Sequence, residues 1–144
     1  MIGKLTGTLT SIVNNQMIID IQGVGYIVFS ANASVKYINN IGSEISVFIE
    51  TIVKEDSITL YGFSNVNDKE CFCNLLSVQG VGAKLALIIL SFFNYSELNT
   101  LIITENKEAI KSIPGIGNKV AERLVRELKD KINTSKTNLL DNMN

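Results

Sequence analysis

Two stretches of the sequence repeat each other at an offset of 35 residues: VQGVGAKLA at residues 78–86 and IPGIGNKVA at residues 113–121. Seven of the nine positions are identical or exchange one aliphatic residue for another. In both copies Gly-aliphatic-Gly precedes a run with helical spacing. A chain that doubles back between two helices in so few residues needs positive φ or close backbone approach, and glycine supplies both. The repeat therefore predicts two matching helix–turn–helix hairpins.

The helix after each glycine pair begins with backbone N–H groups that lack an intrahelical partner, and its peptide dipoles favour an anion there. Lys84 and Lys119 fall in this first turn, where a cation is disfavoured by about 0.3–1 kcal/mol. Two lysines at the same place in a repeat indicate that an external anion is expected at both. A DNA phosphate fits the amides and the ammonium group together.

A basic face continues beyond the second hairpin. Lys119, Arg123 and Arg126 recur at i, i+4 and i+7, opposite the apolar face of that helix. Residues 111–131 hold 6 basic and 3 acidic side chains, whereas the whole chain has a net charge of −1. The alternative is a solvated face, diluted by Glu122–Arg126 and Glu127–Lys131 pairs. The neighbouring glycine hairpin favours phosphate contact, and the predicted DNA-binding residues are Gly80, Gly82, Lys84, Gly115, Gly117, Asn118, Lys119, Arg123 and Arg126.

Residues 1–63 have the composition of strands, with runs rich in Ile, Val, Thr, Tyr and Phe separated by turn-like segments. Short strands are predicted at residues 2–13, 17–22, 26–30, 45–53 and 58–63. Five short strands without a convincing long helix favour a small β-barrel of the OB type, with a sandwich as the alternative.

Residues 64–133 instead carry apolar residues at helical spacing. Helices are predicted at residues 67–78, 83–93, 96–103, 107–113 and 118–132, with Asn67–Glu70 and Asn94–Glu97 as capping pairs. Residues 134–144 are rich in Asn, Ser, Thr and Lys and are predicted to form a flexible tail or the start of a linker. The predicted fold class is α+β, with an all-α domain after the barrel.

The composition excludes several kinds of chemistry. The chain has no His, which removes His-based acid–base catalysis and the common zinc sites. Cys71 and Cys73 point apart on a helix, so two reduced thiols are predicted and not a disulfide. We predict no catalytic residues, no metal and no cofactor. No targeting segment or membrane-spanning run is found, and a cytoplasmic location is expected.

Further motifs follow one another along the chain: MIGKLTG at residues 1–7, GVGY at 23–26, KED at 54–56, LYGF at 60–63 and AERL at 121–124. Together with the two glycine hairpins they resemble the RuvA family, the Holliday-junction-binding subunits of the bacterial branch-migration complex. The resemblance runs from residue 1 to about residue 132, in order and without large gaps.

The resemblance implies an OB barrel followed by two helix-hairpin-helix motifs, assembled as a flat homotetramer or as an octamer of two stacked tetramers. Four subunits would supply eight hairpins, two for each arm of a four-way DNA junction. Glu55 and Asp56 fall at the family's acidic pin; taken alone, they read as a solvated turn. Eight carboxylates at the centre of a fourfold assembly would repel phosphates within about 8–10 Å.

The family's partners are the ring ATPase RuvB and the junction resolvase RuvC, and the sequence departs from the family in two respects. Asn118 stands where members often carry a second basic residue, so weaker binding by the second hairpin is expected. In the family a third domain engages RuvB after a flexible linker. This sequence stops about where that linker begins, as a truncated chain or a naturally short member, so the resemblance does not assign it the loading of RuvB.

The expected function is non-catalytic, structure-specific binding of four-way junctions through the sugar–phosphate backbone. The chain would serve as a scaffold for ATP-driven branch migration in recombination, repair and the SOS response. No P-loop motif occurs, so ATP hydrolysis belongs to a partner. The alternatives are a general single- or double-stranded DNA-binding module, whose barrel aromatics Phe29, Tyr37 and Phe48 would stack on bases, and a metal-dependent nuclease using Glu55 and Asp56.

Overall fold

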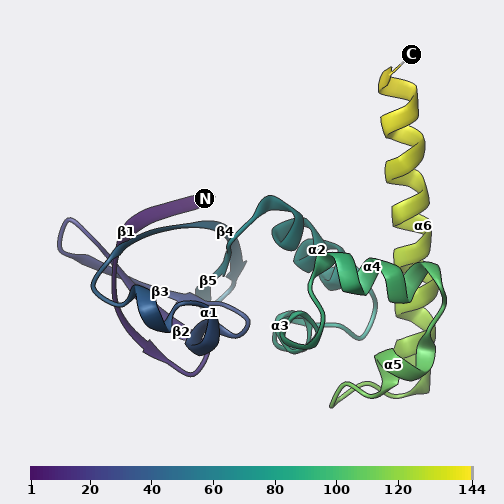
Figure 1. The fold of residues 1–144 in the computed structure, drawn as a ribbon, viewed down its shortest axis with the longest axis horizontal. Helices are drawn as coiled ribbons and strands as arrows, with labels where there is room; N and C mark the ends of the chain where they lie inside the picture. The colour runs from purple at the N-terminus through teal and green to yellow at the C-terminus, as the bar shows by residue number, and fades with distance from the viewer. Residues whose placement is uncertain (144) are drawn as a thin grey trace. The chain divides into compact units, whose positions relative to one another are not determined.

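The N-terminal part of the chain is a closed five-stranded barrel. The computed structural model describes the backbone of residues 1–143 and the side chains of residues 1–132. The strands follow the order β1-β2-β3-β5-β4 around the barrel (Figure 1). Neighbours are antiparallel except β3 and β5, which are parallel. This is an OB-type arrangement, so the barrel prediction is confirmed and the sandwich alternative is wrong. The strands are β1 (Lys4–Val13), β2 (Gln16–Ile21), β3 (Val24–Phe29), β4 (Glu44–Lys54) and β5 (Ser57–Phe63).

Alternation between inward apolar and outward residues is clearest in β2 and β4 and directs one face of these strands into the barrel. The interior is filled by fully buried aliphatic side chains, and Gly62 allows two strands to approach. A Cβ at Gly62 would lie 2.6 Å from Val28 Cγ1. Burial of this cluster holds the β4–β5 hairpin in place. The fully or almost fully buried members are Leu9, Met17, Ile19, Val28, Ala33, Val47 and Ile49.

The connection between β3 and β4 differs from the prediction. It contains a short helix, α1 (Ala33–Lys36), and a 3₁₀ turn, η1 (Ile38–Asn40), where the sequence indicated only turns. Asn32 precedes α1 with φ 54°. Four residues are too few to show a helical period, and Ala33 is fixed by burial in the barrel core. This element therefore arises from packing more than from local pattern.

The remaining chain is helical, as predicted. The helices are α2 (Val66–Leu76), α3 (Ala83–Phe92), α4 (Tyr95–Ile103), α5 (Lys107–Lys111) and α6 (Asn118–Met143). In Figure 1, α6 runs beside α4 and α5, and it packs against both. Residues 134–144 were predicted as a flexible tail or the start of a linker, and the helix found there was not expected. Helical backbone continues through Met143, since neither Gly nor Pro interrupts the sequence after Asn118. Asn144, the last residue of that prediction, lies outside the described residues.

Of the two predicted capping pairs, the structure contains one. The side chain of Asn94 accepts from Glu97 N, and Glu97 Oε1 accepts from Asn94 N, so this capping box is confirmed. The Asn67–Glu70 prediction is wrong. Instead Asn65 Oδ1 accepts from Asp68 N at 2.8 Å: α2 begins at Val66, one residue before the predicted range, and the capping asparagine lies two residues before the predicted one.

Two compact units divide the chain, Met1–Glu70 and Cys71–Asn144. The division between the units falls inside α2, after residue 70. The boundary predicted from composition, after residue 63, is seven residues earlier, at the end of β5. The first turn of α2 thus belongs to the barrel unit, where Asp68 acts electrostatically on Tyr37. Cys71 is buried and Cys73 half-buried in the helical unit, and both are reduced thiols, in agreement with the prediction.

Candidate nucleic-acid interface

The two hairpins are structural copies of each other. Gly80 and Gly115 have φ of 93° and 92°, the left-handed region that glycine accommodates. Val81 N donates to Val78 O at 3.1 Å, and 35 residues later Ile116 N donates to Ile113 O at 3.2 Å. The sequence repeat therefore encodes one turn conformation, formed twice.

The helix after each hairpin begins in the same way. Ala86 N donates to Gly82 O at 2.9 Å, and Ala121 N donates to Gly117 O at 3.0 Å. These bonds make Gly82 and Gly117 the last residues before α3 and α6. Lys84 and Lys119 accordingly lie in the first helical turn, as predicted.

The repeat extends further back than the sequence comparison found. Ser77 Oγ donates to Asn74 O at 2.6 Å, and Ser112 Oγ donates to Ala109 O at 2.5 Å. The pair Ser77 and Ser112 obeys the same offset of 35 residues. In each copy the serine hydroxyl bonds a carbonyl group three residues earlier, at the end of the preceding helix. Such a bond is common and indicates nothing in a single copy, but the recurrence of serine at the offset of the repeat could have been found in the sequence.

The tips of both hairpins are open to solvent. Gly82 and Gly117 are exposed, and a Cβ built on either would meet no atom within 4 Å. Lys84 and Lys119 are exposed as well. Val81, between the first two glycines, is buried, as is its counterpart Ile116. Each hairpin therefore inserts one aliphatic anchor into the core and leaves its glycine backbone accessible to a ligand.

The two hairpins also pack on each other's helices. A Cβ at Gly80 would lie 3.5 Å from Val120 Cγ2 in α6, and a Cβ at Gly115 would lie 3.6 Å from Leu85 Cδ1 in α3. Leu85 and Val120 occupy the same position of the repeat. This exchange of contacts relates the two hairpins by an approximate two-fold operation.

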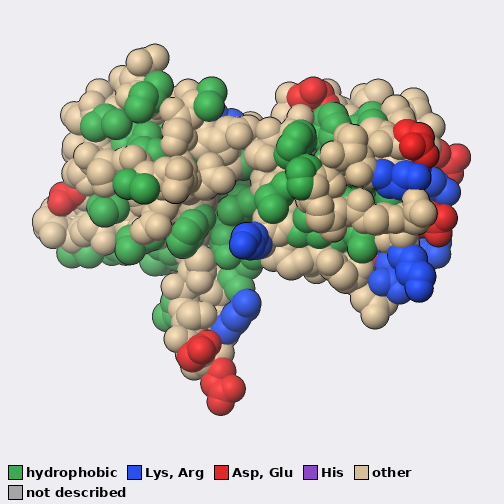
Figure 2. All heavy atoms as spheres, turned by 90° about the horizontal axis from the view of Figure 1, so that it is seen from below, with side chains coloured by type: hydrophobic (Ala, Val, Ile, Leu, Met, Phe, Trp, Pro, Cys, Tyr) green, Lys and Arg blue, Asp and Glu red, His purple; other side chains and the backbone are tan. Residues whose placement is uncertain are grey.

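The three basic residues of α6 that were predicted to bind DNA, Lys119, Arg123 and Arg126, form no ion pair with any residue whose side chain the structure describes. Asn118 and Arg126 are exposed and Arg123 is half-buried. Among the described residues, the Glu122–Arg126 and Glu127–Lys131 pairs of the solvated-face alternative are not formed, and the ion pairs found are Lys111–Glu108 and Lys129–Glu105. Figure 2 shows Lys and Arg side chains gathered on part of the helical unit, with acidic side chains beside them.

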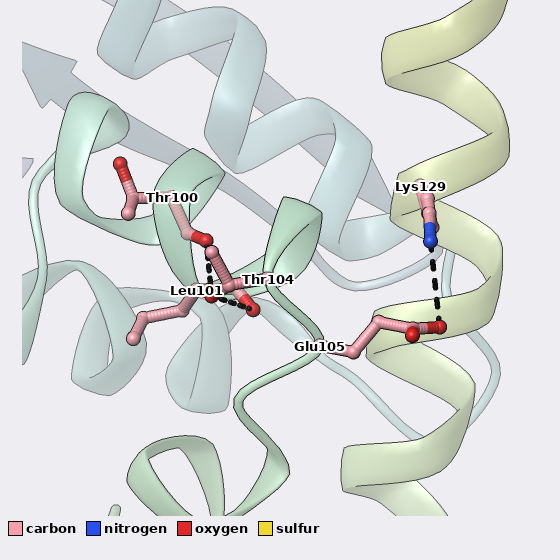
Figure 3. A network of polar contacts seen from close by, with 5 residues as sticks. All are labelled: Thr100, Leu101, Thr104, Glu105 and Lys129. Atoms are coloured by element: carbon pink, nitrogen blue, oxygen red, sulfur yellow. Dashed lines mark hydrogen bonds and ion pairs between the residues drawn. The ribbon is translucent and has the colours of Figure 1, made fainter.

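The ion pair of Lys129 fastens α6 to the loop that precedes α5. Lys129 Nζ lies 3.4 Å from Glu105 Oε1, and Glu105 has φ 53° (Figure 3). The end of α4 is closed beside it, where Thr104 Oγ1 donates to Thr100 O at 2.7 Å. No sequence pattern indicates this connection, because its two residues are 24 positions apart. It joins α6 to the loop before α5, although an exposed ion pair of this kind contributes no more than about 1 kcal/mol to stability.

Glu55 and Asp56 form the two-residue turn between β4 and β5. Lys54 and Ser57 pair across the turn, and both acidic residues are exposed. Behind them Val53 and Ile58 are register partners whose relative exposures are 62% and 70%. Figure 2 shows a protruding arm that ends in acidic side chains. The turn is thus an acidic tip on an apolar stem.

The described residues offer no other chemistry of note. Among the residues whose side chains the structure describes, there is no group of three or more His, Cys, Asp or Glu residues that could hold a metal ion. In the same part of the chain no single helix has the length and apolar character to cross a membrane; only α3 and α4 taken together pass that test, with a 92° bend between them.

Comparison with known proteins decides the family. Residues 1–62 match the description "RuvA N terminal domain", and residues 72–130 match "SAM-like Helix-hairpin-helix tandem". A Rickettsia bellii protein named "Holliday junction branch migration complex subunit RuvA" is 42% identical over 147 aligned positions, which cover 100% of this chain and 72% of the relative. The chain belongs to the RuvA family. The resemblance found in the sequence motifs is therefore confirmed.

Other RuvA relatives are longer. The Bartonella bacilliformis RuvA protein is 45% identical over 91% of this chain, and the Brucella anthropi protein is 44% identical over the same share. The chain spans 60% and 64% of their respective lengths. In this RuvA-family chain the predicted residues fall in two groups, the hairpins with α6 in the helical unit and the acidic turn in the barrel unit.

Proposed function

We propose that this chain binds four-way DNA junctions through their sugar–phosphate backbone, and that it serves as the non-catalytic scaffold of a branch-migration complex. ATP hydrolysis is assigned to a ring-shaped partner ATPase, RuvB in this family. The observation that carries the proposal is the pair of solvent-open glycine hairpins, each followed by an exposed lysine with no carboxylate partner among the described residues.

The pairing of the hairpins supports duplex DNA as the ligand. A duplex presents two phosphate strands related by local two-fold symmetry, and the hairpins are related by an approximate two-fold operation through the contacts of Gly80 with Val120 and Gly115 with Leu85. One hairpin then meets each strand. Contacts to phosphates position a protein on DNA without reading its sequence. A protein that recognises the shape of a junction requires contacts of this kind.

The acidic turn supports binding at a junction centre. The exposed apolar pair Val53 and Ile58 leaves surface that a second copy of the chain would cover, since paired apolar residues on a protruding hairpin favour association. A homotetramer assembled around these stems brings the carboxylates of Glu55 and Asp56 near one another. Their combined field repels phosphates within about 8–10 Å and keeps the exchanging strands apart.

The second candidate function is a general DNA-binding module without junction preference. The barrel offers some support, since Phe29 and Tyr61 lie with ring centroids 6.1 Å apart and are half-buried rather than core. Base stacking on such a pair would favour single strands. However, residues 1–63 hold 3 basic and 5 acidic side chains, a charge balance that opposes binding of a polyanion by the barrel alone.

A competition experiment separates these functions. A fluorescent synthetic four-way junction is titrated with the 144-residue chain, then competed with unlabelled junction, with linear duplex of the same arm sequence and with single strands. Preference for the junction is expected, with a mass in solution that corresponds to four chains or a multiple of four. Equal competition by duplex would establish the general module, and magnesium-dependent cleavage of the junction would establish a nuclease.

A further inference from the structure

The approximate symmetry of the two hairpins is broken at one position. Arg123, in α6, corresponds in the repeat to Ile88 in α3. Arg123 Nη1 lies 3.9 Å from the position of a Cβ on Gly80, whereas the corresponding glycine, Gly115, has only Leu85 within the same range. A guanidinium therefore flanks the first hairpin, and an aliphatic residue stands in the equivalent position for the second.

The charge distribution around the hairpins is consequently unequal. Arg123 follows the second hairpin in sequence, yet its guanidinium is beside the glycine of the first. The first hairpin thus has two cations, its own Lys84 and Arg123. The second has Lys119, with the uncharged Asn118 before it. Sequence reading assigned Arg123 to the second hairpin because the two are adjacent along the chain.

The guanidinium is available to a ligand. Arg123 is half-buried and makes no hydrogen bond or ion pair with any described residue. Five fixed N–H donors in a planar fork suit a phosphate better than an ammonium group does. A Cβ at Gly80 would be in ordinary van der Waals contact with the guanidinium, so the Arg123 side chain lies directly beside the backbone of the first hairpin.

We propose that Arg123 acts with the first hairpin, and that Arg123 and Lys84 contact the same DNA phosphate. Arg123 is then a specificity-determining residue that makes the two hairpins unequal: the first is the dominant anchor and the second the weaker one. This inference rests on the proposed DNA-binding function, since it names which residues of that interface act together.

The test is a pair of double-mutant cycles on the 144-residue chain, read as binding to a synthetic four-way junction over a series of salt concentrations. One cycle combines Lys84→Ala with Arg123→Met, and the other combines Lys119→Ala with Arg123→Met. Methionine keeps an unbranched apolar stem over Gly80 but removes the charge. Lys131→Ala is the control, because Lys131 is an exposed lysine of the same helix, about 18 Å from Lys119 along the axis.

If Lys84 and Arg123 share a phosphate, either one alone keeps that phosphate neutralised. Each single substitution is then expected to change the slope of log K against log salt by clearly less than 0.9 for each engaged subunit, and the double by about 0.9. The double is also expected to bind about threefold or more weaker than the product of the single losses predicts. Lys119→Ala and Arg123→Met are expected to combine multiplicatively.

Three outcomes would overturn the inference. Coupling between Lys119 and Arg123 instead would assign Arg123 to the second hairpin. Multiplicative losses in both cycles would show that Lys84, Lys119 and Arg123 contact different phosphates. Unchanged binding by Arg123→Met would show that Arg123 does not contact DNA. Thermal unfolding of every variant shows whether methionine disturbs the fold. If it does, the same cycles are repeated with Arg123→Gln in place of Arg123→Met. Failure of the unsubstituted chain to bind any DNA would instead overturn the proposed function, and this inference with it.

Discussion

Val120 covers Gly80: its Cγ2 lies 3.5 Å from the position that a Cβ would take on that glycine. The repeat supplies the converse contact, Leu85 over Gly115 at 3.6 Å. Each hairpin is therefore supported by the helix that follows the other one. Neither copy is expected to keep its conformation alone, because the residue that packs on its turn belongs to the second copy.

Substitutions within one hairpin should separate stability from binding. Gly80→Ala is expected to destabilise the fold by about 1–2 kcal/mol, because its φ of 93° is strained for any residue with a Cβ. Gly82→Ala should change stability by less than about 0.5 kcal/mol, since its φ is −94° and its surroundings are empty. A methyl group at this exposed tip should nevertheless weaken junction binding by blocking approach of a phosphate.

The measurement is a urea unfolding curve and a junction titration for each variant. Gly115→Ala and Gly117→Ala form the matched pair in the second hairpin, where φ at Gly115 is 92° and a Cβ at Gly117 also meets nothing within 4 Å. Normal junction binding by both Gly82→Ala and Gly117→Ala would show that the hairpin tips do not face DNA.

Lys119→Ala should weaken binding uniformly over DNA sequences and reduce its salt dependence. One lost phosphate contact is expected to lower the slope of log K against log salt by about 0.9 for each subunit on the DNA. Lys107→Ala is the control: this exposed lysine begins α5, at the end of that helix remote from the glycine turn. An unchanged slope in Lys119→Ala would exclude Lys119 from phosphate contact.

The hairpins could be predicted from the sequence because their determinants are local. Glycine at four fixed positions and a helical period after each pair are sufficient, and the structure has both helices begin where the pattern indicated. The buried and exposed faces of α6 follow equally well from spacing, as Ala121, Leu124, Val125 and Leu128 are all buried.

What the sequence did not predict depends on tertiary contact. The short helix α1 is fixed by burial of Ala33, and no local signal marks it. The Glu105–Lys129 ion pair and the approach of Arg123 to Gly80 join residues far apart in the chain. Such contacts follow from how the two repeats pack, which a single sequence does not show.

Neutralising the acidic turn should tighten DNA binding without altering the fold. Glu55→Gln with Asp56→Asn removes two exposed charges from a two-residue turn and leaves the β4–β5 register intact. Loss of repulsion at the junction centre is expected to raise affinity for a four-way junction more than affinity for linear duplex. Glu44→Gln, an exposed acid at the start of β4, is the control. Weaker junction binding by the double variant would contradict a repulsive role.

The apolar stem behind that turn should control assembly. Val53→Thr with Ile58→Thr keeps β-branched side chains, which favour the strand conformation, while replacing a methyl group of Val53 and the ethyl group of Ile58 by a hydroxyl. We expect the mass of the protein in solution to fall toward that of one chain at low concentration, with the thermal stability of the barrel preserved. Val24→Thr and Ile27→Thr alter other exposed residues of the barrel and serve as the comparison. A mass that did not change would remove Val53 and Ile58 from the subunit interface.

Tyr37 should give the barrel unit a measurable sensitivity to alkaline pH. Burial of the ring, and then the charge of Asp68, raise the pKa of the Tyr37 hydroxyl above 10.0. Because the folded state holds this proton more tightly than the unfolded state, the contribution to stability is complete below the unfolded pKa and is lost as pH rises through the folded pKa. Tyr37→Phe should therefore flatten the decline in urea midpoint above about pH 10. The same decline in Tyr37→Phe as in the unsubstituted protein would show that Tyr37 does not titrate with unfolding.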